Sequence, residues 1–232
     1  MTRALLVCAA EQPGSRELVA DLAPRFDVVI GVDRGGAICF EAGIVPTVLV
    51  GDFDSIEAAF LDEAARRKVP IRSYPADKDQ TDLALAISEA RAFGVAEITV
   101  TAATSERLDH TLGVFAALGS AADLVPRIVE PDLNGWLLSD RGRSAVHLQG
   151  AGSTVSILAF TPTARVSATG VRWPLEHADI SDTDTLGISN VVLGHEAVVT
   201  VEQGAAYVLS PRTDAAPAEQ SPRTAEGTRG VY

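Results

Sequence analysis

Residues 46–55, PTVLVGDFDS, join an apolar run to two aspartates. The apolar part is predicted to be a buried strand, and the apolar spacing over residues 56–67 predicts a helix. Residues two apart in an extended chain point the same way, so Asp52 and Asp54 are expected to direct two carboxylates at one point. Open α/β sheets bind ligands beyond the carboxyl ends of their strands. The pair is therefore either part of a cation site or a solvated acidic turn in which Ser55 caps the next helix.

The segments on both sides repeat this order of a strand followed by a helix. Further strands are predicted over residues 4–10, 27–32, 71–74 and 96–101, and further helices over residues 15–23, 37–42, 80–93 and 108–118. Strands that alternate with helices predict an α/β domain with a mainly parallel sheet.

After residue 122 the pattern changes to short strands separated by glycine and proline turns. They are predicted over residues 128–130, 134–139, 144–148, 154–160, 165–168, 197–202 and 205–210. Serial short strands indicate an all-β sandwich or barrel. We expect an α/β domain over residues 1–124, a β-sandwich domain over 125–211, and a disordered tail over 212–232, which has almost nothing to bury.

Composition narrows the class of protein. The chain has 232 residues and a formal net charge of -12, which argues against a broad surface for nucleic acid or anionic membranes. Cys8 and Cys39 lie in apolar runs and are expected to be buried free thiols. Apolar runs of membrane-spanning length and a signal-peptide pattern are both missing, so a cytoplasmic location is expected.

Two more charged clusters each precede a predicted helix. One is Lys78-Asp79-Gln80-Thr81-Asp82, and the other is Arg107-Leu108-Asp109-His110-Thr111. Each cluster can be a helix cap with local ion pairs, in which Asp79 caps one helix. Alternatively, Lys78 and Arg107 hold a phosphate beside the carboxylates.

In a parallel sheet, the loops that carry these clusters meet at one edge. Six carboxylates are expected to surround a single crevice: Asp33, Asp52, Asp54, Asp79, Asp82 and Asp109. Such a group is poorly designed for stability but suits Mg²⁺ and a polyphosphate. The chain has no Walker or dinucleotide-binding glycine pattern, so nucleotide binding would depend on metal and carboxylates.

Six motifs in this order resemble the thiamine pyrophosphokinase family. Four are the segments 33–37 (DRGGA), 51–56 (GDFDSI), 78–82 (KDQTD) and 107–111 (RLDHT). The other two are 170–175 (GVRWPL) and 187–190 (GISN). Each motif is weak alone, but together they extend the resemblance over about residues 4–210.

The resemblance implies an α/β domain followed by a β-sandwich, a homodimer, and transfer of pyrophosphate from MgATP to the thiamine hydroxyl with release of AMP. It assigns catalysis and Mg²⁺ binding to Asp52, Asp54, Asp79 and Asp82. It assigns nucleotide and phosphate binding to Asp33, Gly35, Lys78, Thr81, Arg107, Asp109 and His110. The resemblance also assigns thiamine binding to Trp173, Ser189 and Asn190. The aromatic face of Trp173 suits a cationic thiazolium. Trp173 can equally be a core or interface residue, and 189–190 a turn.

Two segments depart from the family pattern. Thr104-Ser105-Glu106 replaces expected glycines, and the first strand ends in Cys8-Ala9-Ala10-Glu11-Gln12 instead of a glycine-rich turn. Both changes affect the nucleotide side. The changes at Ser105 and Glu106 leave open a catalytically impaired relative that senses thiamine or nucleotide. A separate alternative is a pyrophosphokinase that acts on another alcohol such as a pterin.

Overall fold

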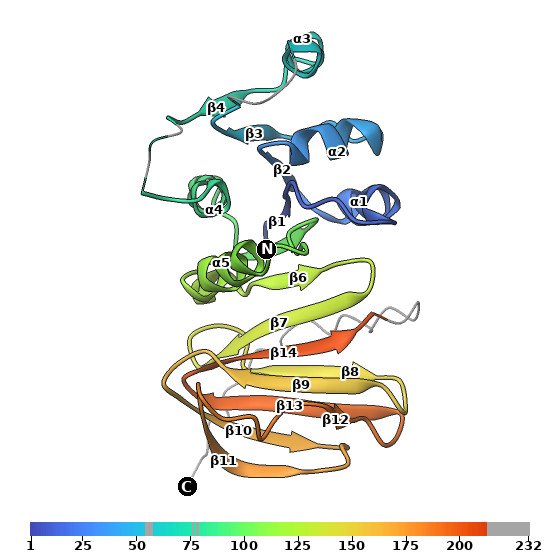
Figure 1. Ribbon diagram of the computed structural model, residues 1–232, viewed down its shortest axis with the longest axis vertical. Coiled ribbons are helices and arrows are strands. Elements are labelled where there is room, and N and C mark those ends of the chain that lie inside the picture. The colour runs from blue at the N-terminus through green and yellow to red at the C-terminus, as the bar shows by residue number, and fades with distance from the viewer. Residues whose placement is uncertain (54–57, 76, 78, 213–232) are drawn as a thin grey trace, which may run out of the picture.

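The computed structural model describes residues 1–53, 58–75, 77 and 79–212 (Figure 1). Its first half alternates strands with helices. The elements are β1 (Arg3–Val7), α1 (Ser15–Leu22), β2 (Val28–Val32), α2 (Gly35–Glu41), β3 (Val48–Gly51), α3 (Ala58–Arg66), β4 (Ile71–Ser73), α4 (Asp82–Ala92), β5 (Glu97–Thr101), α5 (Leu108–Gly119) and β6 (Arg127–Val129). The second half contains strands only: β7 (Leu133–Ser139), β8 (Ala145–Gln149), β9 (Thr154–Ala159), β10 (Thr163–Thr169), β11 (Leu175–Ser181), β12 (Asn190–Val191), β13 (Glu196–Gln203) and β14 (Ala205–Pro211).

The first half forms the predicted parallel sheet. Its strands lie in the order β6-β5-β1-β2-β3-β4, and every neighbouring pair in this part is parallel. The chain moves outward in one direction from β1 to β4 and then returns to β5, on the other side of β1. The carboxyl ends of β1 and β5 therefore form the point at which the strand order reverses, where open sheets bind ligands.

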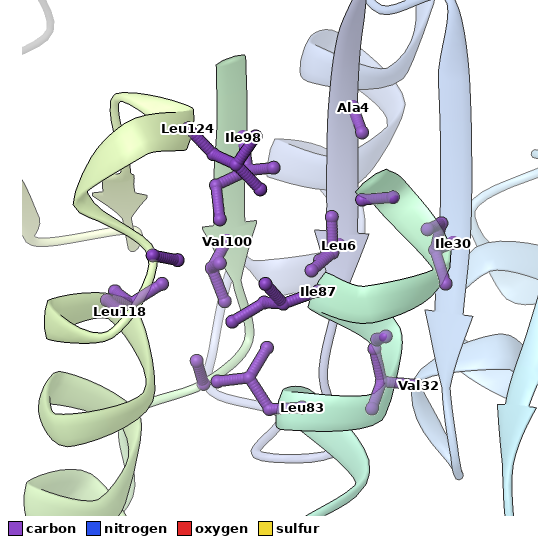
Figure 2. Close-up of a cluster of buried hydrophobic side chains, with 14 of the residues drawn as sticks. Ala4, Leu6, Ile30, Val32, Leu83, Ile87, Ile98, Val100, Leu118 and Leu124 are labelled. Atoms are coloured by element: carbon purple, nitrogen blue, oxygen red, sulfur yellow. The ribbon is translucent and has the colours of Figure 1, made fainter. Parts of the chain in front are cut away.

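Helices cover both faces of this sheet. Figure 1 shows α1 and α2 on one face and α4 and α5 on the other. In Figure 2, Leu83 and Ile87 of α4 lie among Leu6, Ile30 and Val100 of the strands. Strands that are buried on both faces need uninterrupted apolar sequence, which explains the runs seen in β1 and β2.

The second half is a sandwich of two antiparallel layers. One layer, β7-β14-β9-β12, continues the main sheet beyond β6, so that the sheet has ten strands. The other layer is a four-stranded sheet, β11-β10-β13-β8. Buried aliphatic side chains from both layers form the core between them. The fold class predicted from the sequence is confirmed.

Two strands escaped the sequence prediction. In β11, His177 has a positive φ of 48°, and the pairing register of β10 with β11 shifts between Val166 and Ala168. This irregularity breaks the alternation of apolar and polar residues by which strands are recognised. The strand β12 has only two residues, which is too short to produce a pattern.

The proposed division at residues 124 and 125 stays a prediction. It falls just before β6, which pairs with β5 on one side and β7 on the other. Residues 213–232, which include nearly all of the expected disordered tail, lie outside the described residues. Within the described part of the chain, no helix is long and apolar enough to cross a membrane.

Candidate active site

Asp33 follows β2 and lies against the end of β3. Its backbone is in the left-handed region, with φ of 51°, and its N–H donates to the carbonyl of Val50 at 2.8 Å. A Cβ atom on Gly51 would lie 3.1 Å from the Cα of Asp33 and 3.3 Å from its Cβ. Glycine at position 51 therefore lets the loops after β2 and β3 approach closely enough to bring Asp33 beside Asp52.

The electrostatics of Asp33 show which carboxylates surround it. Burial raises the pKa of Asp33 above its ordinary value, and the negative charges of Asp82 and Asp52 raise it further. Its Oδ1 atom is buried and accepts no hydrogen bond from any described residue. The structure thus brings together carboxylates from the loops after β2 and β3 and from the start of α4.

The cluster at residues 79–82 is arranged around the N-terminus of α4. Thr81 is the N-cap, and its Oγ1 accepts a hydrogen bond from the N–H of Ala84 at 3.3 Å. The alternative in which Asp79 caps this helix is therefore wrong. Asp79 is exposed, whereas Asp82, the first helical residue, is partly buried.

The cluster at residues 107–111 opens α5. Nη2 of Arg107 donates to Oδ2 of Asp109 at 2.7 Å, and both side chains are exposed. The arginine lowers the pKa of Asp109. His110 is also exposed. The local ion pair expected as one alternative is thus present, and exposure leaves both groups accessible to a ligand.

Gly35 has a packing role in addition to its predicted phosphate contact. It is buried in the first turn of α2, and a Cβ atom there would overlap the carbonyl oxygens of Val7 and Cys8. Only glycine allows α2 to approach the end of β1 this closely. Its contact with phosphate stays a prediction.

The segment that replaces the expected glycines is held by hydrogen bonds from its own side chains and backbone. The Nε2 group of Gln12 donates to the carbonyl and the Oγ1 of Thr104, at 2.6 and 2.8 Å. Ser105 Oγ accepts from the N–H of Arg107 at 3.2 Å. Thr111 Oγ1 donates to the carbonyl of Ser105 at 3.1 Å. Both departures from the family pattern therefore meet in one network at the ends of β1 and β5.

Glu130 completes this network, and the sequence prediction missed it. Its side chain is fully buried and accepts hydrogen bonds from the backbone N–H groups of Ala102, Ala103 and Thr104, at 3.0, 2.8 and 3.0 Å. The only signal in the sequence is a glutamate directly after the apolar pair Ile128-Val129, where a buried strand leaves no room for an unpaired charge.

Two predicted site residues, Asp54 and Lys78, lie outside the described residues. Among the residues that the structure does describe, no three acidic, histidine or cysteine side chains are grouped closely enough to hold a metal ion. The donor chemistry nevertheless suits Mg²⁺, because Asp33, Asp52 and Asp82 offer only carboxylate oxygens and Oδ1 of Asp33 accepts no hydrogen bond within the described chain.

The predicted thiamine residues lie together on the sandwich. Trp173 is 56% exposed, and the guanidinium carbon of Arg172 lies 5.5 Å from its ring centroid. Asn190 is buried: its Oδ1 accepts from the N–H of Trp173 at 3.1 Å, and its Nδ2 donates to the Trp173 carbonyl at 2.7 Å. Asn190 therefore positions Trp173. Ser189 is exposed, with a positive φ of 60°.

The two groups of predicted site residues lie far apart in one chain. Asn190 belongs to β12 at one end of the ten-stranded sheet, and Gly51 ends β3, which is eight strands away. At about 4.8 Å between neighbouring strands, this separation is roughly 35–40 Å along the sheet. Figure 1 shows the sandwich and the outer strands of the parallel sheet at opposite ends of the molecule.

Comparison with known proteins identifies both halves of the chain. Residues 19–128 match the catalytic domain of thiamin pyrophosphokinase, and residues 145–208 match its vitamin B1 binding domain. The thiamine pyrophosphokinase of Bacillus subtilis is 29% identical over 202 residues, which cover 82% of this chain and 92% of that protein.

Solved structures agree with this assignment. The thiamin pyrophosphokinase of Geobacillus thermodenitrificans is 25% identical, with a TM-score of 0.72 over 93% of this chain and 99% of that one. The Bacillus subtilis structure is 24% identical and has the same fold, with a TM-score of 0.76 over 91% of this chain and all of that one. Because both characteristic domains match in order and together span most of its length, the chain belongs to the thiamin pyrophosphokinase family of enzymes.

Proposed function

We propose that this enzyme transfers a pyrophosphoryl group from MgATP to the hydroxyl group of thiamine, with thiamine diphosphate and AMP as products. The observation that carries the proposal is the match of a catalytic and a vitamin B1 binding domain in one chain. The carboxylates gathered at the ends of β2 and β3 and at the start of α4 support it, because they suit a metal-bound polyphosphate.

We assign the binding of Mg²⁺ to Asp52, Asp54, Asp79 and Asp82. When bound, the ion would supply positive charge that offsets the negative charge developing on the phosphates during transfer. Asp33 lies beside Asp52 and Asp82 and would orient them. Burial raises the pKa of Asp33, and the charges of Asp82 and Asp52 raise it further, so a bound cation would relieve the repulsion here.

The phosphates would also be held by cationic and helix-terminal groups. Arg107 can exchange its exposed partner Asp109 for a phosphate and bind it through two N–H groups. Thr81 caps the start of α4, where the helix dipole favours an anion, and Lys78 is assigned to the same phosphates from its motif in the sequence. His110 and Gly35 are assigned to the same nucleotide side.

In the transfer step, the thiamine hydroxyl oxygen forms a bond to the β-phosphorus of ATP, and the bond from that phosphorus to the α-phosphate oxygen breaks. AMP leaves with the bonding electron pair, and the hydroxyl proton passes to a carboxylate. Asp54 and Asp79 are the two candidates for this base. The chain's contribution is mainly positioning and electrostatics, because the bonds involved are those of the substrates.

Thiamine would bind against the exposed ring of Trp173, beside Ser189 and Asn190. The ring face attracts a cationic thiazolium. Arg172 already lies over this ring, so a cation is held there in the free protein as well. A direct contact from Asn190 is assigned to its backbone, since its side chain is used to hold Trp173.

We further propose that the active site forms between two copies of the chain. A small molecule cannot connect Trp173 to the carboxylates when the sheet between them is roughly 35–40 Å wide. The helix α5 offers a surface for the contact. Leu108 is 68% exposed and Leu112 is 60% exposed, and together with exposed Ala116 they form one apolar stripe at intervals of four residues.

The reaction is tested with purified protein, thiamine, ATP and Mg²⁺. AMP and thiamine diphosphate should form in equal amounts, and Asp54→Asn should abolish both. Absence of AMP above background with ATP, GTP, CTP and UTP would reject the proposed reaction. Size-exclusion chromatography with light scattering tests the homodimer, and a monomer that is fully active at assay concentration would reject the shared site.

Two alternatives are weaker than this proposal. The sensor hypothesis rests on the substitutions at Ser105 and Glu106, and it is weakened because Ser105 makes ordered hydrogen bonds with Arg107 and Thr111. Transfer to a pterin is disfavoured by the match of the vitamin B1 binding domain. An assay that offers thiamine and a hydroxymethylpterin together, and measures which of them receives the pyrophosphoryl group, distinguishes these two acceptors. The cytoplasmic location stays a prediction from the sequence.

A further inference from the structure

The carboxylate of Glu130 occupies a cradle of three consecutive backbone N–H groups. These belong to Ala102, Ala103 and Thr104, directly after β5. Successive N–H groups that converge on one point form an anion-binding concavity. Here the anion is part of the protein. Residue 130 itself is fixed by the hairpin between β6 and β7, in which its N–H donates to the carbonyl of Leu133 at 2.8 Å.

This cradle lies where the strand order of the sheet reverses. The chain ends of β1 and β5 are joined there by backbone hydrogen bonds, from Cys8 to Thr101 at 2.9 Å and from Ala10 to Ala102 at 2.7 Å. Gln12 adds two side-chain bonds to Thr104. A nucleotide that binds at this reversal point meets a loop whose N–H groups are already engaged.

The same loop determines where α5 begins. Thr104 is held by Glu130, Ser105 exchanges hydrogen bonds with Thr111, and Ser105 Oγ accepts from the N–H of Arg107. The buried carboxylate thus holds Thr104, and the next residue, Ser105, holds the backbone N–H of Arg107, the arginine assigned to phosphate. Ala102 has a φ of 50°, a conformation that costs a non-glycine residue free energy and persists only where its surroundings impose it.

We propose that Glu130 is a positioning residue for the nucleotide. By holding the three N–H groups, it sets the position of Arg107 and removes the loop's amides as phosphate ligands, so that phosphate binding depends on the metal and Arg107. This inference rests on the proposed pyrophosphoryl transfer and assigns a role to a residue outside the acidic motifs.

The test compares the variant Glu130→Gln with wild type. An amide cannot accept a hydrogen bond at its nitrogen, so one of the three N–H groups loses its acceptor. The KM for MgATP should rise at least about tenfold, while the KM for thiamine stays within about twofold. Ser139→Ala is the matched control, because Ser139 is a buried polar residue at the other end of β7, where its Oγ accepts a hydrogen bond from the N–H of Arg141. This control should lower Tm without changing either KM.

Gln12→Leu provides a second, independent variant. It removes the two bonds to Thr104, a residue that is only partly buried, and it should also raise the KM for MgATP selectively. If Glu130→Gln fails to fold, Gln12→Leu decides alone. Equal changes of both KM values, or a lower Tm with both unchanged, would overturn the proposal in either variant.

Nucleotide binding separates this inference from the proposed reaction. Calorimetric titration with a non-hydrolysable MgATP analogue, without thiamine, should show the same weakening in both variants. If the wild-type protein binds the analogue but does not pyrophosphorylate thiamine, the proposed reaction is rejected. The role of Glu130 is then still tested by comparing analogue binding in the variants with that in wild type. Wild-type protein that binds no analogue would reject both.

Discussion

Replacing Asp33 with asparagine is expected to make the protein more stable and the enzyme less active. Asparagine has the same shape and tolerates the left-handed backbone that Asp33 adopts. The carboxylate is disfavoured in the fold, because burial and two neighbouring carboxylates raise its pKa and its Oδ1 accepts no hydrogen bond within the described chain. Leaving such a group unsatisfied costs about 1–3 kcal/mol.

The lower end of that range applies, because Asp33 is only partly buried and solvent screens its repulsion. A gain of about 1 kcal/mol in the free energy of unfolding corresponds to a Tm about 2–4 °C higher in a domain of this size. The gain depends on pH. A raised pKa means that the native state holds its proton more tightly, so the penalty is complete above the native pKa and is lost as pH falls to the unfolded value of about 3.9.

The assay is thermal unfolding at pH 7 and at pH 4, with and without MgCl₂. Without metal at pH 7 the variant should be the more stable protein, and the difference should shrink at pH 4. Added Mg²⁺ should stabilise wild type more than the variant, because binding to the native state adds to its stability. Catalytic efficiency should fall about 10²–10³-fold, as for loss of one electrostatic group.

Asp179→Asn is the matched control. Asp179 is an exposed aspartate whose pKa is lowered by its hydrogen bonds to Arg165, on the outer sheet of the sandwich. Its replacement should leave activity and the response to Mg²⁺ unchanged. An Asp33→Asn protein that is less stable than wild type at pH 7 without metal would show that the carboxylate is not strained, and the reasoning would be refuted.

Three further predictions concern the thiamine side, the tryptophan loop and assembly. In steady-state kinetics, Trp173→Ala should raise the KM for thiamine about threefold to thirtyfold, because the cation–π contact is lost, and should leave the KM for MgATP unchanged. The control variant Trp173→Phe keeps an aromatic ring and should retain most of the affinity for thiamine. Asn190→Ala should lower the free energy of unfolding by about 2–3 kcal/mol in urea titrations, because it leaves the N–H and carbonyl of Trp173 without their partner. An unchanged urea midpoint would show that this clamp, the pair of hydrogen bonds from Asn190 to Trp173, does not stabilise the fold. Leu112→Lys should leave Tm of the folded chain nearly unchanged, since the side chain is exposed, but should yield monomers in light scattering and lose activity in parallel; an active monomer would exclude α5 from the interface.

The architecture could be predicted from sequence because its signals are local. Buried strands such as Val28–Val32 are apolar throughout, and the helices between them show their own periodicity. The meeting of Asp33 with Asp52 and Asp82 follows from strand direction alone, without knowledge of any contact. Thr81, rather than Asp79, caps α4, which illustrates that helix ends are less certain than the helices themselves.

The residues that were missed depend on contacts between distant parts of the chain. Glu130 acts on residues that precede it by 26–28 positions, so neither neighbouring residues nor periodicity reveal its role. The clamp of Asn190 on Trp173 spans 17 positions and joins two turns that look independent in the sequence. Buried polar groups must find partners, but sequence does not say which ones.

The helix α5 connects the features that a single chain keeps apart. Arg107 is the N-cap residue at the start of α5, and His110 lies in its first turn, at the edge of the sheet where the predicted nucleotide-binding residues follow the strands. Its other end packs on the sandwich, where Tyr207 OH donates to the carbonyl of Phe115 and the ring of Phe160 leaves no space for a side chain on Gly119. A partner chain that covered the stripe of Leu108 and Leu112 would therefore contact the element that Glu130 positions and the sandwich supports. Burying this stripe would also exclude water from the nearby pair of Arg107 and Asp109, which strengthens any charge contact made there. Assembly and phosphate binding would then reinforce each other through one helix.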